Sequence, residues 1–95
     1  MPKSDRHAAT QSESEPVRQS HEHDVFGRAL REFRARMGLS QEAFGHACGL
    51  HRNYVGAIER GEINPTLKVL MKLANGLGRP LSDLIILWEQ RLEEP

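Results

Sequence analysis

The chain has 95 residues, of which 38% are hydrophobic and 27% charged, and its formal net charge at pH 7 is zero. This length allows one small domain. The single cysteine excludes an internal disulfide framework, and no apolar run approaches the about 20 residues that cross a membrane. The N-terminus lacks the apolar segment of a signal peptide, so we expect a cytoplasmic protein with no membrane partner.

The charges are distributed unevenly along the chain. Residues 25–79 contain nine lysines and arginines against four glutamates, a formal charge of +5. Residues 80–95 contain one arginine against four acidic residues, a formal charge of −3. A basic segment of this kind can attract phosphates on one face even though the whole chain is neutral. The charge pattern is therefore compatible with a nucleic-acid partner.

Residues 1–23 are rich in Ser, Glu, Gln, His and Pro and show no apolar periodicity, which predicts a flexible N-terminal tail. His21, His23 and Asp24 suggest a metal site, but two histidines on a mobile tail are more often solvated, and structural zinc sites have four ligands. We therefore expect no metal and no cofactor. Contact of the tail with DNA is an alternative that its three basic residues, against four acids, support only weakly.

A first helix is predicted over about residues 25–37, with Asp24 as its cap and Gly38 at its end. Its apolar residues step by four, three and four positions, which is the spacing of one buried stripe: Phe26, Leu30, Phe33 and Met37.

Residues 40–61 predict two short helices joined by a tight turn. Ser40 is a suitable N-cap for a helix over about 41–48, whose shared apolar face is formed by Ala43, Phe44 and Ala47. Gly49 suits the turn because glycine adopts a positive φ without a side-chain clash. Cys48 lies in an apolar context, which favours a buried structural thiol over a reactive one.

The second helix of this unit is predicted over about residues 51–60, and Gly61 follows it as a stop signal. Its apolar face continues the pattern through Leu50, Tyr54, Val55 and Ile58. The opposite face carries forked donors and an amide, the groups that recognise base edges in a major groove, on or beside these residues: His51, Arg52, Asn53, Gly56 and Arg60.

Asn64-Pro65 marks a loop, after which Thr66 caps a helix over about residues 67–77. The residues expected to point inward from this helix are Leu67, Leu70, Met71, Ala74 and Leu77.

The last helix is predicted over about residues 81–92, and it is more apolar than a lone small domain can bury. Residues around Ile85, Trp88 and Leu92 would be exposed in a monomer, and each buried side chain of that size stabilises an interface by roughly 1.5–3 kcal/mol. We therefore expect a two-fold homodimer through this helix. A monomer with a fuller core is the alternative.

The pattern resembles the helix-turn-helix of phage-repressor/Cro-like proteins, also called XRE-type regulators, over about residues 25–84. The similarity lies in the Ser40-Gln41-Glu42 start, Gly45, Gly49, Val55, the Ile58-Glu59-Arg60-Gly61 sequence and the Asn64-Pro65-Thr66-Leu67 sequence. The resemblance implies an all-α, compact five-helix, lambda-repressor-like DNA-binding domain. Its helix-turn-helix would be formed by helices 2 and 3, and residues 24–95 would serve for DNA binding and dimerisation.

The resemblance further implies a transcriptional regulator that binds double-stranded DNA sequence-specifically, as a homodimer on an operator with two half-sites. Helix 51–60 would enter the major groove, where Arg52 suits guanine and Asn53 suits adenine. Gln41 matches a position that touches phosphate or an outer base. The resemblance also implies an ion pair of Arg34 with Glu59. The remaining candidates for DNA contact are His51, which replaces a usual Ser or Thr cap, Tyr54, Arg60, Asn64 and Lys68.

A compact chain of this kind is similar to the controller proteins of restriction–modification systems, which dimerise through the last helix. An antitoxin or a phage-type repressor of the same fold, or a protein-interaction module without DNA binding, are alternatives. No paired carboxylates, nucleophile triad or phosphate loop is evident, so we expect neither an enzyme nor a small-molecule ligand.

Overall fold

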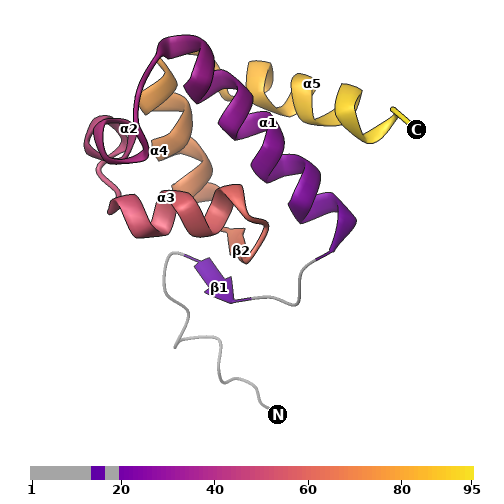
Figure 1. The fold of residues 1–95 in the computed structure, drawn as a ribbon, viewed down its shortest axis with the longest axis horizontal. Helices are drawn as coiled ribbons and strands as arrows, with labels where there is room; N and C mark the ends of the chain where they lie inside the picture. The colour runs from indigo at the N-terminus through magenta and orange to yellow at the C-terminus, as the bar shows by residue number, and fades with distance from the viewer. Residues whose placement is uncertain (1–13, 17–19) are drawn as a thin grey trace.

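The computed structural model describes residues 14–16 and 20–95 (Figure 1). In this part of the chain, five helices follow one another: α1 (His21–Met37), α2 (Gln41–Cys48), α3 (Arg52–Glu59), α4 (Leu67–Leu77) and α5 (Leu81–Leu92). Two short strands accompany them: β1 (Ser14–Pro16) and β2 (Ile63–Pro65). This architecture confirms the predicted all-α, five-helix fold. None of the described helices is both long and apolar enough to span a membrane.

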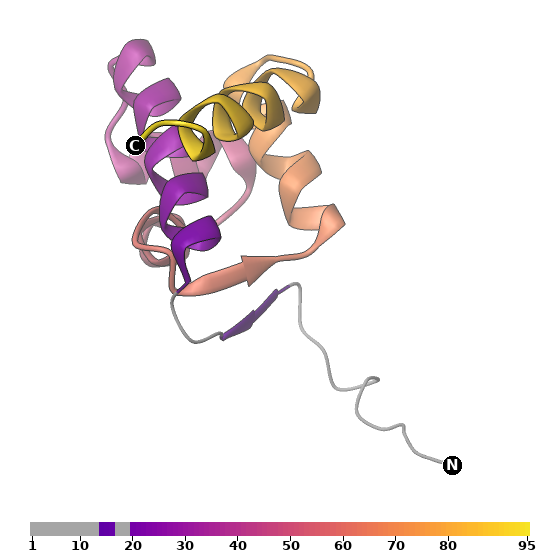
Figure 2. The same ribbon diagram turned by 90° about the vertical axis from the view of Figure 1, so that its right-hand side faces the viewer.

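The helices enclose one core, because each contributes one apolar face to it. α1 packs against α3 and α5, and α2 packs against α3 and α4 (Figures 1 and 2). At one edge, the rings of Phe26 and Trp88 meet edge to face with their centroids 5.8 Å apart, which anchors α5 on α1. The largest side chains that are fully buried come from all five helices: Leu30, Phe44, Val55, Ile58, Val69, Leu73 and Leu84.

The start of α1 differs from the prediction. The helix begins at His21, and its N-cap is Ser20, whose hydroxyl accepts a hydrogen bond from the His23 amide at 3.3 Å. Asp24 therefore lies inside the first turn, where a carboxylate favours the positive end of the helix dipole. The flexible tail predicted for residues 1–23 lies mostly outside the described residues; within them, residues 14–16 form a strand and residues 21–23 are helical.

A two-stranded ribbon was not predicted. β1 pairs antiparallel with β2, in the register Ser14 opposite Pro65, Glu15 opposite Asn64 and Pro16 opposite Ile63. In both views β1 lies outside β2, at the end of the domain formed by α3 and the loop that follows it (Figures 1 and 2).

The inward face predicted for α4 is partly wrong. Leu67 and Met71 are 69% and 56% exposed, whereas Val69 and Leu73 are fully buried. Apolar residues occupy seven of the eleven positions of α4, so more than one stripe fits the sequence, and packing against α2 selects between them.

The first and second helices show smaller differences of the same kind. Met37 is 42% exposed because it ends α1 next to Gly38, beyond the core. In α2, Phe44 is buried as predicted, but Gly45 and Cys48 share its face, while Ala43 and Ala47 are exposed.

Candidate nucleic-acid interface

The turn between α2 and α3 is built by residues that satisfy the helix ends. Ser40 caps α2 by accepting a hydrogen bond from the Ala43 amide at 3.0 Å, and Gly49 ends it with φ of 76°. His51 is the N-cap of α3, and its Nδ1 accepts a hydrogen bond from the Asn53 amide at 3.0 Å. The imidazole thus performs the capping role, and α3 begins one residue later than predicted.

α3 has one face in the core and one face in solvent. Val55 and Ile58 are fully buried, whereas His51, Arg52 and Asn53 are exposed on the first turn. Tyr54 is half-buried and packs against the core cluster. Gly56 is buried instead of forming part of the outer face.

Behind α3, a polar network fixes the helix to its neighbours. The Arg34 guanidinium donates to both carboxylate oxygens of Glu59, and the Gln41 side-chain amide donates to Glu59 Oε1 at 2.9 Å. Arg34 Nη1 also donates to the carbonyl oxygen of Leu39 at 2.8 Å. The hydrogen bond with Glu59 raises the pKa of Arg34. These contacts join the end of α1, the start of α2 and the end of α3, so α3 is presented from a rigid support.

Both arginines predicted to contact DNA are paired with carboxylates on the same surface. Arg52 Nη1 lies 3.5 Å from Glu42 Oε1, across a depression between α2 and α3. Arg60 Nε and Nη2 donate to the two carboxylate oxygens of Glu62 at 2.8 and 3.2 Å, and this pairing lowers the pKa of Glu62. Neither glutamate was predicted to belong to the site. These glutamates lie ten residues before Arg52 and two residues after Arg60. Their pairing with the arginines could not be predicted from the sequence, because it depends on how the fold brings the side chains together.

The loop after α3 places the remaining candidates. Asn64 Oδ1 lies 3.2 Å from His23 Nε2 of α1, and the Asn64 backbone pairs with Glu15 of β1. Lys68 is exposed in the first turn of α4, which Thr66 caps by accepting from the Val69 amide at 3.2 Å. Among the described residues, no group of three or more His, Cys, Asp and Glu is placed to hold a metal ion.

The residues predicted for a dimer interface lie along one side of α5. Ile85, Trp88 and Leu92 are each half-buried, and Trp88 Nε1 donates to the Glu22 carbonyl oxygen at 3.0 Å. Beside them, an apolar hollow between α1, β2, α4 and α5 is lined mainly by Phe26, Pro65, Leu70, Ile85 and Trp88. The exposed Leu67 and Met71 of α4 extend the apolar surface that sequence reasoning assigned to the last helix alone.

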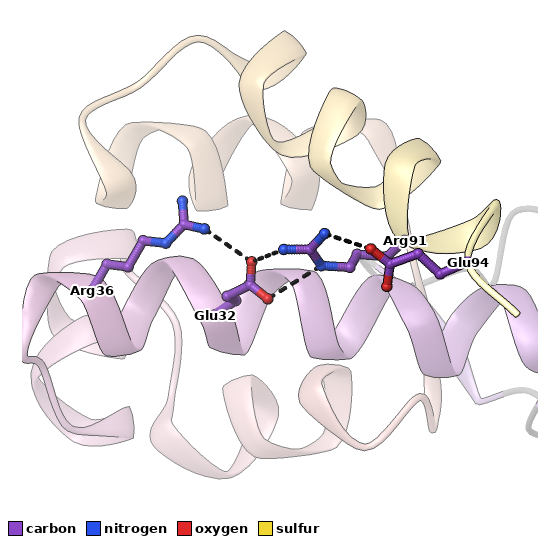
Figure 3. A network of polar contacts seen from close by, with 4 residues as sticks. All are labelled: Glu32, Arg36, Arg91 and Glu94. Carbon is purple, nitrogen blue, oxygen red and sulfur yellow. Dashed lines mark hydrogen bonds and ion pairs between the residues drawn. The ribbon is translucent and has the colours of Figure 1, made fainter.

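Ion pairs also hold α5 against α1, on a different side of α5 from the apolar hollow (Figure 3). Arg91 donates to both oxygens of Glu32, at 2.7 and 3.3 Å, and Arg36 and Glu94 extend the network. The hydrogen bond from Arg91 is the main cause of the lowered pKa of Glu32. The position of α5 on the domain is therefore fixed by polar as well as apolar contacts.

Comparison with known proteins adds to this geometry. Residues 30–84 match a protein-family model described as helix-turn-helix. The control protein C.SmaI of Serratia marcescens is 37% identical over 62 residues, which cover 65% of this chain and 74% of that protein. The crystal structure of the restriction-modification controller protein C.AhdI of Aeromonas hydrophila is similar with a TM-score of 0.67 and 42% identity, over 68% of this chain and 98% of that one. The controller C.Esp1396I, solved as a tetramer with its natural 35 base-pair operator, shares the fold with a TM-score of 0.75 at 22% identity, over 80% of this chain and all of that one.

Proposed function

Because the chain belongs to the helix-turn-helix family of transcriptional regulators, we propose that it binds an operator with two half-sites in double-stranded DNA, as a homodimer. The main support is the first turn of α3, where exposed Arg52 and Asn53 project from a helix whose other face is buried. A rigid helix with a forked donor and an amide on its outer face matches the geometry that major-groove recognition requires. The members of this family regulate transcription and are not enzymes.

In this mode α3 lies in the major groove and α2 crosses the backbone above it. Arg52 donates to guanine O6 and N7, and Asn53 contacts adenine. His51 lies at the groove edge, where its ring is already used as the helix cap. Arg60 and Lys68 contact phosphates on either side of the loop between α3 and α4.

Three of the predicted contacts have a second role inside the protein. The Gln41 side-chain amide already donates one of its two N–H groups to Glu59, so its second N–H group and its carbonyl oxygen are the side-chain groups that remain for DNA. Tyr54 serves mainly to pack α3 on the core. Asn64 is held by His23 and by the ribbon, so we assign its phosphate contact to the loop as a unit.

The homodimer is proposed to form through α5 with a contribution from α4. Ile85, Trp88 and Leu92 offer a half-buried apolar stripe, and Leu67 and Met71 add large apolar side chains that are more than half exposed. A two-fold interface that covers these residues would remove them from water. The combined apolar surface of α4 and α5 supports association more strongly than the surface of α5 alone.

The experiment that tests this function selects binding sites from a random pool of DNA duplexes. We expect a two-fold related consensus whose half-sites are one helical turn, about 34 Å, apart. Binding of the selected duplex should weaken steeply with salt, because phosphate contacts release counterions. Failure to retain any duplex at low salt would contradict DNA binding, and a selected site without two-fold symmetry would contradict the dimer.

A further inference from the structure

We propose that Glu62 is a positioning residue for Arg60 and sets how strongly the protein discriminates its operator from other DNA. This inference rests on the proposed function, since it assigns a role within the same DNA-binding surface. It concerns a carboxylate that neither the family match nor the sequence pattern assigns to that surface.

The pair is a two-bond ion pair with good geometry. Arg60 Nε lies 2.8 Å from Glu62 Oε2, and Nη2 lies 3.2 Å from Oε1. The Arg60 side chain is 59% exposed and the Glu62 side chain is 50% exposed, so the pair lies at the surface and not in the core. A guanidinium held by two parallel bonds has a defined direction, unlike one that is held by a single contact.

The backbone fixes the position of Glu62. Gly61 adopts a φ of 75°, and the amides of Gly61 and Glu62 donate to the carbonyl oxygens of Ile58 and Ala57, each at 3.0 Å. This is a Schellman arrangement, which reverses the chain directly after α3. A Cβ atom added to Gly61 would lie 3.0 Å from the backbone of Asp24, so α1 supports the turn from behind. The Glu62 carboxylate is therefore presented from a turn whose backbone is held by hydrogen bonds to α3 and by packing against α1.

The Arg60 guanidinium occupies the space beside α3 that the missing side chain of Gly56 leaves. A Cβ atom at this position would lie 3.0 Å from Arg60 Nη1 and 3.3 Å from Gln41 Oε1. The guanidinium thus lies back along α3, across Gly56 and beside the start of α2, instead of extending away from the protein. Gly56 leaves the space, and Glu62 holds the arginine in it.

This placement affects specific and non-specific DNA in different ways. An unrestrained arginine side chain can form an ion pair with any nearby phosphate, so it strengthens binding to every DNA sequence equally. An arginine held over Gly56 contributes only where the duplex is seated deeply enough on α3 to meet it. This restraint therefore weakens loosely seated complexes more than the operator complex.

The test measures binding of Glu62→Gln to two duplexes, the operator selected from a random pool and an unrelated duplex of equal length. The variant keeps the size of the side chain and removes its charge. We expect affinity for the unrelated duplex to rise about tenfold and affinity for the operator to rise only about twofold, so that their ratio falls about fivefold. Glu93→Gln is the matched control: this exposed residue follows α5, and the same charge change there should leave the ratio unaltered.

A double-mutant cycle with Arg60→Ala separates positioning from simple repulsion. If Glu62 acts through Arg60, adding Glu62→Gln to Arg60→Ala leaves the ratio of affinities unchanged. A full effect of Glu62→Gln in the absence of Arg60 would overturn the positioning role, and so would a Glu62→Gln variant that behaves like Glu93→Gln. Absence of salt-dependent DNA binding in the unmodified protein would instead overturn the proposed function, so the two failures are distinguishable.

Discussion

The guanidinium of Arg34 on α1 forms two hydrogen bonds with the carboxylate of Glu59 on α3, 2.6 Å from Nε to Oε2 and 3.0 Å from Nη2 to Oε1. Only 3% of the Glu59 side chain and 14% of the Arg34 side chain are exposed. A carboxylate buried to this degree needs its cation, because water cannot replace the lost bonds. The contact therefore connects the stability of the domain to the placement of its proposed recognition helix.

Replacing Arg34 should destabilise the protein strongly. Arg34→Ala leaves Glu59 buried with Gln41 as its main side-chain donor, and we expect the free energy of unfolding to fall by about 3–5 kcal/mol. Urea denaturation followed by circular dichroism measures this loss. Arg28→Ala is the control, because its ion pair with Asp24 is exposed and should contribute at most about 0.5 kcal/mol. Equal losses in the two variants would show that the buried pair has no special role.

Replacing Arg52 should reduce specificity as well as affinity. Arg52→Ala should weaken binding to the selected operator by about 1–3 kcal/mol and relax the preference at one base pair of each half-site. Binding to a panel of single-base variants of the operator measures both effects. Arg79→Ala is the control. Arg79 precedes α5 and forms an exposed ion pair with Asp83, so its replacement should leave the base preferences unchanged. Uniform weakening across the panel by Arg52→Ala would reduce this residue to a phosphate contact.

Polar substitution on the outer face of α4 should weaken the dimer. Met71→Gln removes an apolar side chain that is 56% exposed in the single chain, so its loss should not disturb the core. We expect the dissociation constant of the dimer to increase about tenfold or more, as the burial of one such side chain predicts. Sedimentation equilibrium measures the change. Ile86→Gln is the control, since Ile86 is 50% exposed on a different side of α5, and an equal effect there would place the interface elsewhere.

The buried thiol should make stability depend on pH only in the alkaline range. Burial raises the pKa of Cys48 from 9.0 to about 11, so the folded protein retains a proton that the unfolded chain releases above pH 9. The contribution of the buried thiol to the free energy of unfolding is fully present well below pH 9. It decreases as the pH rises towards 11, by about 1 kcal/mol at pH 10. Urea denaturation at pH 7.5 and pH 10 measures the loss, and Cys48→Ala should lack this part of it. A pH dependence that is identical in the two proteins would assign it to other groups.

Local signals explain why most of the fold could be predicted. Ser40 with Gly49, and Thr66 with Gly78, cap α2 and α4, and the bounds of both helices follow from these residues. The start of α1 was missed because its cap, Ser20, stands in a polar segment where no apolar periodicity marks a helix. The ribbon depends on pairing between segments about 50 residues apart, and neither three-residue strand has an alternating pattern of its own.

The candidate site could be predicted less completely, since side-chain partners depend on the assembled fold. The exposure of Arg52 and Asn53 follows from helical periodicity alone. The outward position of Leu67 does not, because the many apolar residues of α4 allow several faces. The pairing of Arg60 with Glu62 depends on the chain reversal at Gly61, because this turn brings the two side chains next to each other.

The ribbon also determines where foreign sequences can be attached. Because Ser14 of β1 lies opposite Pro65 of β2, close to the start of α4, a fluorescent protein or affinity tag joined upstream of β1 would be tethered on the side that approaches the duplex in the proposed binding mode (Figures 1 and 2). The chain leaves α5 at the far side of the domain, so a cargo fused behind Pro95 avoids that space. Immobilisation on a sensor chip or labelling for imaging should therefore use the carboxyl end, with a spacer that keeps the cargo clear of Leu92 in the proposed dimer interface.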